Sequence, residues 1–163
     1  SAPVFGGVYK LAAVEDEQGN IIPKIKISEN TTKITNPHYK KLYRFYDNES
    51  GKALADELCV YDETIDGTKP HTIFDPDAIW KTKTLTDYSV KELHVTVFKN
   101  GELVYKQPSL FEIKRYCAEQ TETLWDEVKR FENPHTYYVD LSKKLWDIKN
   151  ALLEKSKDGK DLK

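Results

Sequence analysis

The chain has 163 residues and a formal net charge of −2, from 25 basic and 27 acidic residues. This length allows one or two small domains. The balanced charge argues against nucleic-acid binding, which needs a basic excess on one surface. No apolar run approaches the roughly 18 residues of a membrane helix, and no signal peptide opens the sequence. We therefore expect a cytoplasmic protein with neither nucleic-acid nor membrane partners.

The beginning of the chain predicts a fragment of a longer protein. The sequence contains no Met, and it opens on an apolar, glycine-rich loop, Ser1–Gly7, that leads directly into a predicted strand. Exposed termini are normally polar and loosely held, whereas this stretch is typical of the inside of a fold.

Four short strands are predicted in the first third of the chain, each rich in aliphatic or aromatic residues and bounded by turn residues. Gly19 and Gly51 lie near the ends of two turns, where a positive φ is often needed. The fourth segment also contains a stretch that is compatible with a helical turn. The predicted strands form an antiparallel meander within residues 1–62, and they span residues 8–15, 21–27, 40–46 and 52–61.

A polar linker over residues 62–69 leads to His71, which lies four residues before Asp75. A base or a metal ligand is one interpretation of this pair. A catalytic base needs an orienting group and a substrate within reach, and no third partner is evident. We therefore favour a packed or exposed His.

The next predicted element is a β-hairpin over residues 92–106. Alternating apolar residues flank Asn100-Gly101, a pair that favours a two-residue turn in which both residues have a positive φ. Val95 and Val97 share one face of the first strand, and we expect them to point inward.

Two helices are predicted to follow. Ser109 and Glu112 form a capping box, and an apolar stripe at three- and four-residue steps continues to Phe131, before Asn133-Pro134. This helix would be about 35 Å long, and its stripe is expected in the core. The second helix begins at residues 140–142. The hairpin and the two helices define a C-terminal α+β domain over residues 63–154, followed by a charged, disordered tail over residues 155–163.

The residues by themselves show no catalytic constellation. There is no Ser, His and Asp set in motif order, no P-loop and no metal-ligand spacing. Cys59 and Cys117 are the only cysteines, and their separation predicts two buried free thiols.

Several stretches follow one another along the chain as family-like motifs: Phe5-Gly6-Gly7-Val8-Tyr9-Lys10-Leu11, Lys24 to Pro37, Lys41-Leu42-Tyr43-Arg44, Glu92 to Lys106, Leu124 to Arg130, and Val139-Asp140-Leu141-Ser142 with Leu145-Trp146-Asp147. In this order they resemble the late part of nicotinate phosphoribosyltransferases of the bacterial type. The resemblance covers nearly the whole chain. His38 departs from the family pattern, which usually has Gly after the Pro that corresponds to Pro37, and this departure bears on the tightness of that turn.

This resemblance implies a fragment of a type II phosphoribosyltransferase, an enzyme of NAD salvage. The family joins nicotinate to phosphoribosyl pyrophosphate and couples this step to ATP hydrolysis, with Mg²⁺ and a phosphohistidine. The full-length parent is expected to be a homodimer with an upstream barrel domain that carries this chemistry. The fragment alone is expected to bind no cofactor and to be inactive. None of the four His residues lies in a context typical of the phosphohistidine.

Lys10 is the residue that the resemblance nominates for substrate binding, because it follows a loop that lies after the family's phosphate site. A structural Lys on a strand is the alternative. The meander is expected to pair with an upstream segment or with a second copy, since isolated strands leave their edges exposed. Two other hypotheses remain: a stand-alone protein-binding module that docks through the meander, and a relative that uses nicotinamide.

Overall fold

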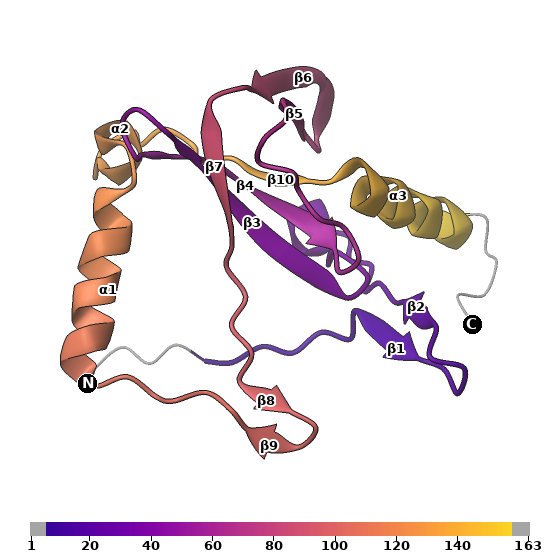
Figure 1. Cartoon of the computed structure of the whole chain (residues 1–163). Helices are drawn as coiled ribbons and strands as arrows, with labels where there is room; N and C mark the ends of the chain where they lie inside the picture. Colours follow the sequence, from indigo (N-terminus) through magenta and orange to yellow (C-terminus); the bar gives the residue numbers. More distant parts are fainter. Residues whose placement is uncertain (1–5, 158–163) are drawn as a thin grey trace. The chain divides into compact units, whose positions relative to one another are not determined.

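The computed structural model describes residues 6–157 (Figure 1). Its residue contacts divide the chain into two compact units. The first unit contains the described residues up to Lys40 together with those from Lys143 onward, and the second is Lys41–Ser142. Each unit contains helical segments and at least one small β-sheet, so the predicted α+β class is confirmed. The expected domain boundary at residue 62 falls inside the second unit.

The first unit contains a two-stranded antiparallel sheet of β1 (Ala13–Glu15) and β2 (Ile21–Pro23). The Asp16 carboxylate accepts hydrogen bonds from the backbone N–H groups of Gln18 and Asn20, at 3.0 and 2.8 Å, and Gly19 has a φ of 82°. The unit also holds the short 3-10 helix η1 (Thr31–Lys33) and the helix α3 (Lys143–Lys157). Both strands are much shorter than predicted. At the first strand, residues 6–11 are exposed and lie outside any sheet.

The second unit is built on a four-stranded sheet with the order β10-β4-β3-β7. Its strands are β3 (Lys40–Asp47), β4 (Ala53–Val60), β7 (Tyr88–Glu92) and β10 (Val139–Leu141). β7 runs antiparallel to β3, and β10 runs parallel to β4. The expectation that β3 and β4 need an upstream strand is wrong, because later segments of the same chain occupy both positions beside this hairpin.

A second hairpin, which the sequence did not predict, covers this sheet. β5 (His71–Asp75) pairs antiparallel with β6 (Ala78–Leu85), with an irregularity in register between Phe74 and Asp75. The hydrophobic core forms where this hairpin meets the sheet, and it comprises Phe45, Ala55, Ile73, Leu85 and Tyr88. The ring of Tyr88 meets Phe45 edge-on with the centroids 5.4 Å apart.

The predicted Asn-Gly hairpin is present, but its strands are short. β8 (Phe98–Lys99) pairs with β9 (Glu102–Leu103), and the φ angles of Asn100 and Gly101 are 52° and 81°. Both turn residues therefore have the positive φ that the sequence predicted. The prediction that Val95 and Val97 point inward is wrong, because 64% and 43% of their surfaces are exposed.

The predicted long helix is two helices, α1 (Leu110–Glu122) and α2 (Asp126–Lys129). The capping box of Ser109 and Glu112 is confirmed. The helix is interrupted after Glu122 because the chain there binds the start of β4. The Lys52 ammonium donates to the carbonyl oxygen of Glu122 at 2.7 Å, and the Ala53 N–H donates to that of Thr123 at 2.7 Å.

Three further expectations are corrected. α1 contains no buried residue, so its apolar stripe is not part of the core of this chain. Cys59 is buried as predicted, but Cys117 is exposed on α1. Lys155–Lys157 continue α3 instead of beginning a disordered tail, and the rest of that tail lies outside the described residues. No helix in the described part of the chain is long and apolar enough to cross a membrane.

Candidate functional site

Lys10, the predicted substrate-binding residue, lines a groove of about 590 Å³ in the first unit. The extended stretch around Tyr9 forms one wall, and the chain that leaves β2 forms the other. Lys24 and Lys26 also line the groove, and the remaining lining is apolar: Tyr9, Leu11, Pro23, Ile25, Ile27 and Leu152.

The charge of this groove favours an anionic ligand. Lys10, Lys24 and Lys26 are among its lining residues and no Asp or Glu is, as far as the described residues show. Lys10 and Lys26 are exposed, so water screens their charges. Substrate binding by Lys10 stays a prediction.

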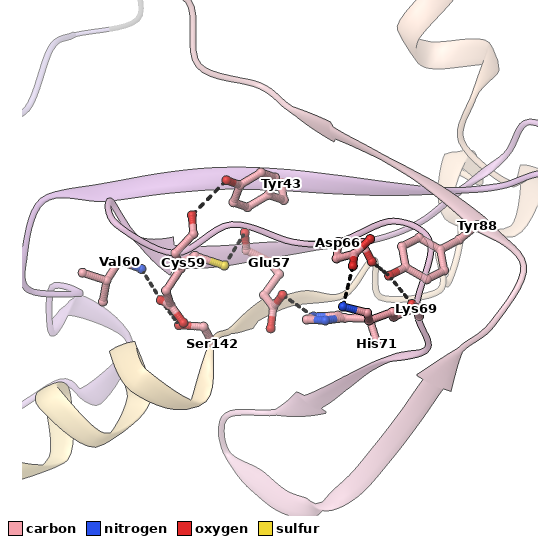
Figure 2. Close-up of polar contacts among 10 residues, drawn as sticks. Tyr43, Glu57, Cys59, Val60, Asp66, Lys69, His71, Tyr88 and Ser142 are labelled. Carbon is pink, nitrogen blue, oxygen red and sulfur yellow. Dashed lines mark hydrogen bonds and ion pairs between the residues drawn. The ribbon is translucent and has the colours of Figure 1, made fainter.

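A separate group of polar side chains lies between the sheet of the second unit and the β5–β6 hairpin. Figure 2 shows Glu57 of β4 and His71 of β5 pointing toward one another, and the Glu57 Oε2–His71 Nε2 distance is 2.7 Å. The His71 ring also stacks on Phe45, with the ring centroids 5.2 Å apart. His71 thus has a partner, Glu57, that the sequence did not indicate, and it is the packed His of the favoured interpretation.

A second ion pair joins β3 to β4. The Arg44 guanidinium donates to both carboxylate oxygens of Asp56, at 2.7 and 2.9 Å, and the Tyr137 hydroxyl donates to the same carboxylate at 2.8 Å. Asp56 is only 5% exposed. Hydrogen bonding to Asp56 raises the pKa of the Arg44 guanidinium, so this pair stays charged. The pair ties β3 and β4 to the segment that leads into β10.

Glu63 connects the end of β4 to Ser142, the residue that follows β10. Its carboxylate accepts hydrogen bonds from the Val60 N–H at 2.6 Å and from the Ser142 hydroxyl at 2.7 Å. The Tyr43 hydroxyl donates to the Glu63 carbonyl oxygen at 3.1 Å (Figure 2). The sequence placed Ser142 at a helix start, but it gave no sign that Glu63 would bind it.

Asp140 is a buried acid on β10, 4% exposed, directly opposite Glu57 in the parallel register. Burial raises the pKa of the Asp140 carboxyl to about 6, and the negative charges of Glu57 and Asp75 add to this effect. Asp75 and Asp140 both line a cavity of about 280 Å³ together with residues of β5 and β6.

These groups stabilise the fold, and they do not form a catalytic centre. Glu57, Asp56 and Glu63 are each engaged by a partner that joins two segments of the unit. Burial raises the pKa of the Cys59 thiol, which disfavours the thiolate needed for nucleophilic attack. No group of three His, Cys, Asp or Glu side chains in the described ranges is placed to hold a metal ion.

A family model described as the nicotinate phosphoribosyltransferase C-terminal domain matches residues 39–149. The chain belongs to the nicotinate phosphoribosyltransferase family. The sequence-based resemblance is thereby confirmed. The matched region includes the whole sheet of the second unit, both of its added hairpins and the first half of α3.

Curated relatives named nicotinate phosphoribosyltransferase support the same assignment. The protein of Bacillus subtilis is 37% identical over 90% of this chain and 30% of its own length. That of Dictyostelium discoideum is 32% identical over 99% of this chain and 28% of its own length. A crystal structure of human nicotinic acid phosphoribosyltransferase has a TM-score of 0.66 and 25% identity, covering 73% of this chain and 24% of that one. The chain thus spans less than a third of the relatives it matches.

Proposed function

We propose that this chain is the C-terminal part of an enzyme that makes nicotinate mononucleotide. In that reaction the ring nitrogen of nicotinate attacks the anomeric carbon of phosphoribosyl pyrophosphate, and pyrophosphate leaves. The observation that carries the proposal is the family match over residues 39–149. The three-lysine groove is the feature of this chain that fits an anionic substrate.

The polar groups of the second unit fit a supporting role in this enzyme. Transfer of a phosphoribosyl group needs cationic groups aligned on the leaving pyrophosphate and on the 5-phosphate. Arg44 is committed to Asp56, and His71 is held by Glu57. The transfer chemistry, and with it the barrel domain that the family resemblance implies, therefore belongs to a part of the enzyme beyond this chain, and this chain alone would be inactive.

The family resemblance also implies ATP and Mg²⁺, a homodimer and a cytoplasmic location. The described residues offer no converging set of carboxylates that fits Mg²⁺. We therefore assign no step to these cofactors within this chain, and we expect the other part of the enzyme to bind them.

A chimeric enzyme tests the proposal. In the Bacillus subtilis relative, the stretch of 147 aligned residues would be replaced by this chain. We expect the chimera to form nicotinate mononucleotide from nicotinate and phosphoribosyl pyrophosphate, and this chain alone to form none. A chimera that folds with normal stability but lacks activity would contradict the proposal. A chimera that prefers nicotinamide to nicotinate would favour the alternative hypothesis of a nicotinamide-using enzyme.

Lys10 is proposed to contact a phosphate of the substrate. In the chimera, Lys10→Ala should raise the KM for phosphoribosyl pyrophosphate by about 10- to 150-fold, because a charge-assisted hydrogen bond contributes about 1.5–3 kcal/mol. Ile22→Ala is the matched control, since Ile22 is exposed on β2 and does not line the groove. An unchanged KM for Lys10→Ala would leave Lys10 a structural residue.

A further inference from the structure

The segment 93–122, here named the arm, exposes an unusual amount of apolar surface for a folded chain. It contains the β8–β9 hairpin and α1, and the structure buries none of its residues. Soluble proteins seldom expose large contiguous apolar patches except where a partner binds. Its exposed large apolar side chains are Val95, Val97, Phe98, Leu103, Val104, Tyr105, Leu110, Phe111, Ile113 and Tyr116.

The arm is attached to the sheet at both ends. At its start, the Leu93 N–H donates to the Leu42 carbonyl oxygen at 2.8 Å. At its end, the Lys52 ammonium donates to the carbonyl oxygen of Glu122, the last residue of α1, and the Ala53 N–H donates to that of Thr123. Hydrogen bonds thus fix both ends of the arm to the sheet, although none of the residues between them is buried.

The sequence of the arm is that of a buried segment. Leu110, Ile113 and Tyr116 recur at three-residue steps on α1, and Cys117 lies beside them. Charged residues occupy a different side of the helix, where Arg115 and Glu119 form an exposed ion pair. A 13-residue helix is only marginally stable in water without tertiary packing. The described residues therefore supply no surface that covers the apolar stripe of α1.

We propose that the arm docks onto the part of a nicotinate phosphoribosyltransferase that this chain lacks, with the Leu110–Ile113–Tyr116 stripe at the centre of the interface. This inference rests on the proposed function. The human structure that matches this fold has about three-quarters of its length outside the match, and the Bacillus subtilis relative has 70%. Each relative therefore has a large additional part onto which the arm could dock. The arm itself lies within the matched family region, residues 39–149.

Hydrogen exchange on the isolated chain and on the chimera described above tests the docking. Amides of residues 110–122 should exchange rapidly in the isolated chain and about tenfold or more slowly in the chimera, because docking suppresses local opening. Equally rapid exchange in a folded chimera would overturn the proposal. Slow exchange in an isolated chain that forms dimers would also overturn it, since a second copy would then cover the arm.

Two chimera variants separate the stripe from the rest of α1. Ile113→Asp with Tyr116→Asp adds two negative charges to the stripe and should lower the midpoint of thermal unfolding by about 5 °C or more. Arg115→Glu changes the charge by the same amount on the charged side and should leave the midpoint within about 1 °C. Equal shifts in both variants would contradict the proposal. These readouts do not depend on catalysis, so an inactive but stably docked chimera would refute only the proposed function.

Discussion

His38 adopts a backbone conformation that is unusual for a residue with a side chain. Its φ is 77°, in the left-handed region that favours glycine, and its N–H donates to the Ala12 carbonyl oxygen at 2.7 Å. The sequence resemblance placed a Gly at this position in the family. The structure thus shows that the turn keeps a glycine-like conformation even though a side chain is present.

Replacing His38 tests the cost of this conformation. His38→Ala should lower the free energy of unfolding by about 1 kcal/mol, since Ala keeps the left-handed strain and loses the hydrogen bond from the Tyr39 N–H to Nδ1. His38→Gly loses the same hydrogen bond but relieves the strain, so it should be about 0.5–1 kcal/mol more stable than His38→Ala. Urea titration of both variants measures the difference, and a Gly variant no more stable than the Ala variant would contradict the account.

Asp140 predicts a pH dependence of stability. Its folded-state pKa is raised to about 6, above its ordinary value of 3.8, so the folded state holds this proton more tightly than the unfolded state. Its contribution therefore stabilises the fold below pH 4 and is lost as the pH rises through 6. Asp140→Asn should raise the free energy of unfolding at pH 7.5 by about 1–3 kcal/mol.

The same variant has an internal control. Its advantage should shrink as the pH falls from 7.5 to 4, because Asp140 then becomes protonated in the folded protein as well. Val139→Ala, on the same strand but 56% exposed, should show no such pH dependence. An advantage of Asp140→Asn that is constant with pH would show that packing, and not ionisation, is responsible.

The buried Arg44–Asp56 pair works between elements, because it joins β3 to β4 and, through Tyr137, to the chain before β10. Asp56→Ala would leave the guanidinium in a largely buried site without its carboxylate. We expect a loss of about 3 kcal/mol in the free energy of unfolding. Tyr137→Phe removes one hydrogen bond and should cost about 1 kcal/mol. A double-mutant cycle in urea measures the coupling, and purely additive effects would contradict a shared network.

The attachment of α1 is also a property of elements. Lys52 holds the carbonyl oxygens of Glu122 and Leu124, at 2.7 and 3.3 Å, where a cation also interacts favourably with the helix dipole. In the chimera, Lys52→Met should accelerate hydrogen exchange in α1 without affecting the strands β5 and β6. Lys52→Arg keeps the charge and should preserve most of the protection; equal effects of the two substitutions would exclude a role for the charge.

At the scale of the whole molecule, the two compact units divide the chain differently from its predicted domains. The second unit collects segments that are up to about 100 residues apart, because β10 pairs with β4 and returns the chain to the sheet after the arm. This closure gives a rigid sheet with a long loop inserted between β7 and β10.

Limited proteolysis of the isolated chain should reflect this organisation. A protease that cuts after large apolar residues should cleave first within residues 94–116, where such side chains are exposed. The core strands β3 and β4 should resist, because backbone pairing on both sides protects them. The two fragments should remain associated after cleavage, as shown by size-exclusion chromatography, because β10 holds the C-terminal piece on the sheet. Initial cleavage in β3 or β4 would contradict the structure.

The sequence alone determined the features that depend on neighbouring residues. The Asn100-Gly101 turn, the Ser109–Glu112 capping box and the strands β3 and β4 are set by local conformational preference and alternation, and all are present. The family was also accessible, because its motifs keep their order along the chain.

Only the tertiary structure decided which of these elements meet. β6 contains a Lys-Thr-Lys-Thr stretch, and neither β5 nor β6 has a simple apolar alternation, so their strand character depends on pairing with each other. The pairing of Glu57 with His71, and of β10 with β4, joins residues far apart in sequence. Conversely, the apolar patterns of Val95, Val97 and α1 predicted burial, and the described residues leave these side chains exposed. Apolar periodicity reports that a face needs a partner, and only the assembled structure reports which partner it has.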